Sequence, residues 1–212
     1  DFFRINVDGA LNVLHASATA GLQRMVFVSS GSTIGEAEDA IGDETTERRN
    51  YALSDYERSK VQAEATLLEH ADAIDLVIVN PGTVYGPGDA SGTGQSLIGS
   101  LTGRLGVSVE APAAWVYVED VARANMLALN NGGAQAFNIG CGTGISVNTL
   151  VQKLRGVIEY EGKPIYSEPR LGDVYKITLD ASRANLELGW EPEVSLEDGL
   201  AHTVSAIRQS LV

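Results

Sequence analysis

Tyr56 and Lys60 are the residues whose types and spacing first indicate chemistry. They stand four positions apart in the sequence, and residues four apart on a helix lie one above the other. A free phenol has a pKa of about 10, whereas a proton donor and acceptor works best near the operating pH. A neighbouring ammonium favours the ionised phenol. The spacing therefore predicts a tyrosine acting as general acid and base beside an activating lysine, although it also fits an exposed helical pair without chemistry.

A helix and two buried strands must position this pair. Apolar residues at helical spacing predict a helix over 3–19 that ends at Gly21. The short apolar run 24–29 is typical of a strand buried on both faces of a parallel sheet, and the run 75–80 predicts a second strand. A helix over about 52–72 carries Tyr56 and Lys60. The second strand breaks at Pro81-Gly82, and the glycine-rich stretch 86–94 predicts a long loop.

The rest of the chain keeps alternating between helix and strand. We expect further helices over 95–103, 119–130, 146–155, 182–188 and 196–210, and strands over 115–118, 135–139 and 164–168. This alternation predicts the α/β class. The sequence contains no internal repeat and no linker that would separate independent domains.

Composition excludes several classes of protein. The hydrophobic fraction is 44%, and no apolar run approaches the ~18 residues of a membrane span. The first residues do not resemble a signal peptide. A formal charge of −13 disfavours nucleic acid and anionic lipid as partners. The single cysteine, Cys141, cannot form an internal disulfide and is interpreted as a small buried thiol, which fits a cytoplasmic location.

No metal site is predicted. The three histidines stand singly on predicted helices, without a second ligand at metal spacing: His15, His70 and His202. Asp43 and Glu44 are interpreted as part of a solvated loop rather than a catalytic carboxylate pair. Trp115 and Trp190 are expected to anchor the core.

Several segments resemble the extended short-chain dehydrogenase/reductases, the NAD-dependent epimerase/dehydratase type. They follow one another in the order found in that family: NVDGALNVLHASATAGLQRMVFVSS, SSGSTIGE, NPGTVYGPGD, VYVEDVARA, FNIGCGTGISVNTL and RLGDVYKITLDASRANLELGWEP. The resemblance implies a partial Rossmann-type parallel sheet with a small C-terminal α/β substrate-binding region. Residues 1–90 and 113–140 would belong to the dinucleotide-binding part, and residues 91–112 and 141–212 to the substrate-binding part.

The resemblance also assigns roles near the tyrosine. Tyr56 would be the general acid and base, and Lys60 would lower its pKa and hydrogen-bond the nicotinamide ribose. Ser30 falls where the family places the hydroxyl that orients the substrate, with Ser29 and Ser32 close enough to take that role instead. A loop serine also fits simple turn hydrogen bonding.

Further roles follow for residues later in the chain. Pro81 and Gly82 would set the backbone against the nicotinamide ring, and Ser32 and Thr83 would contact substrate. Arg170 and Asp173 would grip a nucleotide diphosphate, to which a guanidinium fork is suited. The same arginine also fits a surface ion pair.

The implied function is NAD(P)-dependent epimerase or dehydratase chemistry on a nucleotide-sugar-like substrate. Three departures bring the sequence closer to relatives that reduce ketones with NADPH. Ala113-Ala114-Trp115 stands where Arg-Asp-Phe is common, Thr83 stands where asparagine is common, and residues 99–114 look shortened. A ketone reductase of the dihydroflavonol-reductase-like type and a non-catalytic dinucleotide-binding protein or inert fragment therefore remain alternatives.

The start of the chain departs most from the family. A dinucleotide-binding fold opens with a strand, a glycine-rich turn and a helix that receives the pyrophosphate, and residue 1 falls inside what resembles a later helix. We expect roughly 70 to 90 residues to be missing and the fragment alone to bind cofactor weakly. The acidic residue or arginine that distinguishes NAD from NADP would lie in that missing segment. The resemblance also implies a homodimer through the helices flanking the active site.

Overall fold

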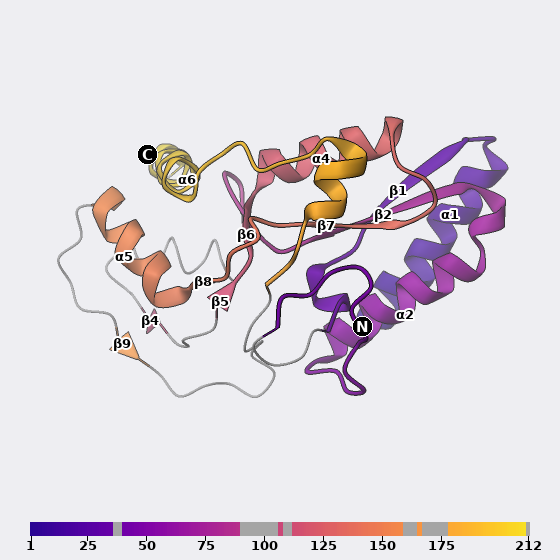
Figure 1. Cartoon of the computed structure of the whole chain (residues 1–212), viewed down its shortest axis with the longest axis horizontal. Helices are drawn as coiled ribbons and strands as arrows, with labels where there is room; N and C mark the ends of the chain where they lie inside the picture. Colours follow the sequence, from indigo (N-terminus) through magenta and orange to yellow (C-terminus); the bar gives the residue numbers. More distant parts are fainter. Residues whose placement is uncertain (36–39, 90–105, 108–111, 159–164, 167–177, 211–212) are drawn as a thin grey trace.

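The central sheet contains three parallel strands. The computed structural model describes residues 1–35, 40–89, 106–107, 112–158, 165–166 and 178–210. Strands β1 (Arg24–Val28), β2 (Asp75–Pro81) and β7 (Ala136–Ile139) lie side by side in the order β1-β2-β7 (Figure 1). Their register pairs Val28 with Val79, and Val79 with Phe137. The carboxyl ends of the three strands therefore meet at one edge.

Two helices cover one face of this sheet. A π-helical turn (Arg4–Asp8) leads into α1 (Gly9–Thr19), and α2 (Asp55–Glu69) packs beside them (Figure 1). Leu14 and Leu67 from the helices join Leu76 and Ile78 of β2 in one buried cluster. A short 3₁₀ turn, Ala71–Ala73, links α2 to β2.

The opposite face is covered by α4 (Val118–Asn130) and by the π-helical segment Ala184–Leu188 (Figure 1). Val77 and Val79 of β2 pack there with Ala124, Phe137 and Trp190. Because side chains of a strand alternate between its two faces, β2 contributes to both clusters. The run predicted to be buried on both faces was 24–29, and that prediction is wrong: β1 lies at an edge of the three-stranded sheet, its residues are only partly buried, and Val28 is 40% exposed.

The remaining elements form a second region. Strand β3 (Thr83–Tyr85) pairs in parallel with β6 (Trp115–Tyr117), and β4 (Gly106–Val107) with β9 (Ile165–Tyr166). Strand β5 (Pro112–Ala113) pairs antiparallel with β8 (Ile145–Ser146). Helix α5 (Val147–Ile158) packs against α6 (Leu196–Ser210). The core of this region joins side chains from several of these elements: Tyr85, Trp115, Tyr117, Leu150, Leu154, Leu200, Val204 and Ile207.

The chain leaves the central sheet at Gly82. Its amide donates to the Ile139 carbonyl over 2.9 Å, and the next amide, of Thr83, donates to the Ala114 carbonyl over 2.8 Å. A Cβ atom at Gly82 would lie 2.1 Å from the Ala114 oxygen, so this close approach requires glycine. The predicted break after residue 80 is confirmed, but strand β3 immediately beyond it was not predicted, because three residues give too short a pattern to recognise.

Most of the predicted elements are present with small shifts at their ends. The α/β class is confirmed, as are the predicted helices over 3–19, 52–72, 119–130, 146–155 and 196–210, and the helical turn over 182–188 is π-helical. The predicted helix over 95–103 lies outside the described residues. The division into a dinucleotide-binding part and a substrate-binding part stays a prediction. In the described part of the chain, no helix has the length and apolar character needed to span a bilayer.

The interpretation of Glu44 as a solvated loop residue is wrong. Its side chain is only 4% exposed. The Asn138 amide donates to its Oε1 atom over 2.6 Å, and the Arg183 guanidinium lies 3.7 Å from Oε2. Glu44 therefore anchors the loop to strand β7. Trp115 and Trp190, at 7% and 0% exposure, are core residues as predicted.

Candidate active site

Helix α2 begins at a well-formed cap. The Ser54 side chain accepts a hydrogen bond from the Glu57 amide over 3.1 Å, which satisfies one of the unpaired amides of the first turn. The Glu57 carboxylate reaches back and accepts from the Leu53 amide over 2.9 Å. These two contacts fix the helix start on both sides of Tyr56.

Tyr56 and Lys60 lie on the same side of this helix. The Lys60 Nζ atom is 6.0 Å from the centre of the Tyr56 ring and 5.5 Å from that of Phe27. It donates a hydrogen bond to the Val28 carbonyl oxygen at 3.4 Å. Tyr56 is 39% exposed, and its ring meets that of Phe2 edge to face with centres 5.9 Å apart.

The serine residues form a compact turn directly after β1. Ser30, in extended conformation, caps the 3₁₀ turn Gly31–Thr33. Its Oγ atom accepts from the Ser32 amide at 3.3 Å and from the Ser32 hydroxyl at 3.0 Å. The Ser30 carbonyl accepts from the Thr33 hydroxyl at 2.8 Å. Ser30 and Ser32 thus act as a pair of linked hydroxyls on a turn that contacts α2.

Only some of the other predicted site residues belong to the part of the chain that the structure describes. Pro81 ends β2 and is buried, Gly82 crosses to the next strand, and Thr83 opens β3. They lie at the same sheet edge as the serine turn, since β2 is the neighbour of β1. Arg170 and Asp173 lie outside the described residues, so their predicted contact with a diphosphate stays a prediction.

Burial shapes the electrostatics behind the tyrosine. Partial burial lowers the pKa of Lys60, and the nearby Glu64 carboxylate acts in the opposite direction. Burial raises the pKa of Glu64, with the hydroxyls of Ser29 and Thr33 and the Lys60 charge opposing the rise. Among the described atoms, Ser29 Oγ and Glu64 Oε1 are both buried without a well-formed hydrogen bond. The base of the site is therefore a poorly solvated environment for charge.

Sequence reasoning missed three residues that support the site. Glu64 continues the line of Tyr56 and Lys60 by one more helical turn, a spacing that could have revealed it. The Asn6 side chain donates to the Ser59 hydroxyl over 2.9 Å and ties the π-helical turn to α2. Glu57 is buried, but nothing in its sequence context distinguishes it from an exposed helical glutamate.

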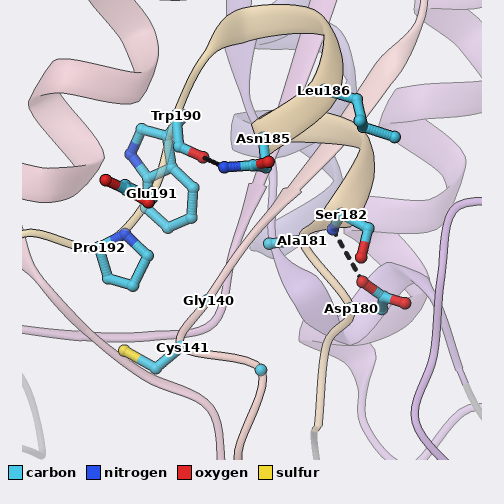
Figure 2. A pocket seen from close by; sticks show the side chains of 11 residues that line it. Gly140, Cys141, Asp180, Ala181, Ser182, Asn185, Leu186, Trp190, Glu191 and Pro192 are labelled. Carbon is cyan, nitrogen blue, oxygen red and sulfur yellow. Dashed lines mark hydrogen bonds between the residues drawn. The ribbon is translucent and has the colours of Figure 1, made fainter.

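The hollow in Figure 2 lies away from these residues. It has a volume of about 400 Å³ and is lined by the segment after β7 and by the π-helical segment. Asp180 accepts from the Ser182 amide at 2.8 Å, and Asn185 donates to the Trp190 carbonyl at 3.4 Å (Figure 2). Cys141, a free and half-buried thiol, also lines it. Asp180 and Asn185 thus hydrogen-bond the local backbone. None of the predicted catalytic residues lines the hollow.

Two of the three histidines, predicted to stand singly, lie together in the structure. The His15 and His70 rings meet edge to face with centres 5.6 Å apart, and His202 contacts Tyr117. Within the described ranges, no group of three or more His, Cys, Asp or Glu side chains could hold a metal ion.

Comparisons with known proteins find relatives that match nearly the whole chain. A putative UDP-glucose 4-epimerase from Methanocaldococcus jannaschii is 32% identical over 217 residues, which cover 97% of this chain and 70% of that protein. The UDP-glucose 4-epimerase of Thermotoga maritima, solved with UDP-glucose, superposes with a TM-score of 0.90 at 34% identity, covering 99% of this chain and 71% of that one. MoeE5, solved with UDP-glucose and NAD, gives a TM-score of 0.90 at 30% identity, covering 99% and 73%.

The match to a family is independent of any single relative. Residues 1–140 match the NAD dependent epimerase/dehydratase family. That range includes β1, the serine turn, α2 and β2, and thus every described residue to which a catalytic role was assigned. The chain belongs to the NAD dependent epimerase/dehydratase family.

Proposed function

We propose that this chain carries the acid–base machinery of an NAD(P)-dependent epimerase or dehydratase acting on a nucleotide sugar. The observation that carries the proposal is the placement of Tyr56 and Lys60 on one side of α2, beside the serine turn at the carboxyl end of β1. Ligands of parallel α/β sheets bind at this edge. The UDP-glucose 4-epimerases to which the chain is similar support the substrate class.

Each group has one role in the proposed reaction. Tyr56 takes the proton of the sugar hydroxyl and later returns it. Lys60 has three N–H donors, one of which is directed at the Val28 carbonyl, and it hydrogen-bonds the nicotinamide ribose with another. Ser30, linked to Ser32, orients the substrate oxygen. NAD, when bound, would accept a hydride from the sugar carbinol carbon and return it to the resulting ketone.

The residues present fit a nicotinamide at this edge. Pro81 and Gly82 lie at the carboxyl end of β2, at the same sheet edge as the serine turn, where ligands of parallel α/β sheets bind. Lys60 is half-buried and keeps donors available. Tyr56 is 39% exposed. Arg170 and Asp173 would hold the diphosphate of the substrate, as the family resemblance implies.

A second candidate is a ketone reductase that consumes NADPH. It is favoured by Ala113, which stands where nucleotide-sugar relatives often carry the arginine of an Arg-Asp-Phe segment. The two activities differ in stoichiometry, because an epimerase returns its hydride to the substrate whereas a reductase does not. Loss of nicotinamide absorbance in proportion to product would identify the reductase.

We further propose that the protein forms a homodimer through α1 and α2. Large apolar side chains are exposed on these helices, with Val13 at 55% and Leu68 at 51%. Burying such a surface favours association. Size-exclusion chromatography with light scattering tests this proposal, and a monomer at micromolar concentration would contradict it.

The functional proposal is tested by incubating the full-length protein with NAD and UDP-glucose, UDP-glucuronate or dTDP-glucose in parallel, and separating the products by chromatography. Interconversion or dehydration without net change in cofactor supports it. A protein that binds NAD but converts none of these sugar nucleotides would contradict it.

A further inference from the structure

An ion-pair network lies directly behind the predicted catalytic tyrosine. Glu57, the residue after Tyr56, is 1% exposed, and the guanidinium groups of Arg48 and Arg49 both contact its carboxylate. The Arg49 Nη2 atom lies 2.7 Å from Oε1, and the Leu53 amide donates to Oε2 over 2.9 Å. Burial of a carboxylate is tolerated only when charged partners and hydrogen bonds compensate for the lost water. The network is therefore a fixed part of the fold.

Arg48 uses the same guanidinium to hold the serine turn. Its Nη1 atom donates to the carbonyl oxygen of Thr33 at 2.7 Å and to that of Ser32 at 3.3 Å. Its Nη2 atom pairs with Glu57. A planar fork can serve three acceptors in fixed directions, which a lysine ammonium cannot reproduce. One side chain thus joins the turn that carries Ser30 to the first turn of α2.

The loop around the guanidinium is shaped to admit it. Gly35 has a left-handed backbone with φ of 61°, and a Cβ atom there would lie 2.5 Å from the Arg48 Nη1 atom and 2.8 Å from its Cγ atom. The Arg49 amide donates to the Gly35 carbonyl over 3.0 Å. Glycine at this position therefore serves both the turn and the placement of Arg48.

We infer that Arg48, held by Glu57, is a positioning residue that fixes the serine turn relative to Tyr56. The inference rests on the proposed function, because that reaction requires a serine hydroxyl and the phenol to reach the same substrate oxygen. A misplacement of 1 Å in such a constellation lowers the rate by up to about 100-fold. Arg48 acts through the turn and needs no contact with substrate or cofactor.

The variant Arg48→Lys in the full-length enzyme tests this inference. We expect kcat to fall roughly 10- to 100-fold, with the KM for the sugar nucleotide within about twofold of wild type. Glu57→Gln, which weakens the hold on Arg48, is expected to change kcat in the same direction. The matched control is Arg58→Lys, because Arg58 pairs with Asp55 on the surface and its side chain is 61% exposed. It should keep the wild-type kcat.

A second measurement follows the turn itself. The amides of Thr33 and Ile34 donate to the carbonyls of Ser30 and Gly31 at 3.0 and 3.2 Å, so hydrogen exchange of the peptide covering this turn reports its stability. Arg48→Lys should accelerate this exchange and leave that of strand β2 unchanged. Circular dichroism and thermal melting confirm that the variants are folded.

The outcomes separate the two proposals. A wild type without turnover on any sugar nucleotide would refute the proposed function, and with it the catalytic part of this inference. An active wild type with an Arg48→Lys variant of unchanged kcat per folded molecule would refute the inference alone, even if exchange of the turn is faster. Loss of kcat together with faster exchange of the turn supports the positioning role.

Discussion

The ammonium nitrogen of Lys60 lies 3.4 Å from the carbonyl oxygen of Val28, the last residue of strand β1. The same nitrogen is 6.0 Å from the centre of the Tyr56 ring. One side chain therefore docks α2 onto the strand end and approaches the Tyr56 ring. Since the serine turn begins two residues after Val28, the strand end sets the spacing of all three groups.

Lys60→Met should lower kcat by about 10²- to 10⁴-fold, the range by which acid–base catalysis accelerates reactions. Methionine keeps most of the length of the side chain but removes its charge and donors. Lys153→Met is the control. Lys153 lies on α5, outside the predicted site, and pairs with Glu197 of α6. Steady-state kinetics on both variants provides the measurement, and a Lys60→Met enzyme as fast as the control would contradict the role of the lysine.

Glu64→Gln should change how stability depends on pH. Burial raises the pKa of Glu64 above its ordinary value of 4.5, so the folded state keeps this proton at a higher pH than the unfolded chain does. The stability that the protonated group contributes is complete below pH 4.5 and is lost as the pH rises through the folded pKa. The variant should therefore gain in free energy of unfolding relative to wild type as pH rises.

Urea denaturation of wild type and Glu64→Gln from about pH 4 to pH 8 measures this difference. Glu69→Gln on the same helix is the control, because Glu69 is exposed. A Glu64→Gln difference that stays constant across this range would show that the carboxyl titrates equally in both states.

Gly82→Ala should destabilise the protein by about 1–3 kcal/mol. The added methyl group would meet the Ala114 backbone oxygen at 2.1 Å, and β3 and β6 would have to separate to admit it. Gly133→Ala is the matched control, because nothing lies within 4 Å of a Cβ atom there. Thermal melting of the two variants compares them, and equal melting temperatures would disprove the close approach.

Glu44→Ala should cost about 1–3 kcal/mol, because it leaves the Asn138 amide unpaired inside the protein. Glu47→Ala, at an exposed position of the same loop, should be nearly neutral. Denaturant unfolding of both variants measures the cost. Similar stabilities would mean that the loop is not anchored through Glu44.

The sequence predicted the elements of the sheet well because their residues carry strong local patterns. The run Asp75–Asn80 alternates its side chains between two covered faces, and such an apolar run has few alternatives to a buried strand. The Tyr56–Lys60 spacing likewise needs only a helix to place the two side chains on one side.

The supporting contacts could not be predicted because they join residues far apart in the chain. Glu44 meets Asn138 across 94 positions, and its acidic neighbours make the segment look like a solvated loop. From the sequence, Glu57 and Arg48 resemble ordinary surface charges. In the fold, Glu57 is buried between the guanidinium groups of Arg48 and Arg49. Only tertiary packing decides whether such a charge is exposed or compensated.

The most direct test of the central claim replaces Tyr56 with phenylalanine in the full-length enzyme and measures both turnover and bound NAD. Phenylalanine keeps the ring and its edge contact with Phe2, whose centre lies 5.9 Å away, and removes only the hydroxyl. We predict that turnover falls by about 10²-fold or more while NAD remains bound. Turnover at the wild-type rate would contradict the account.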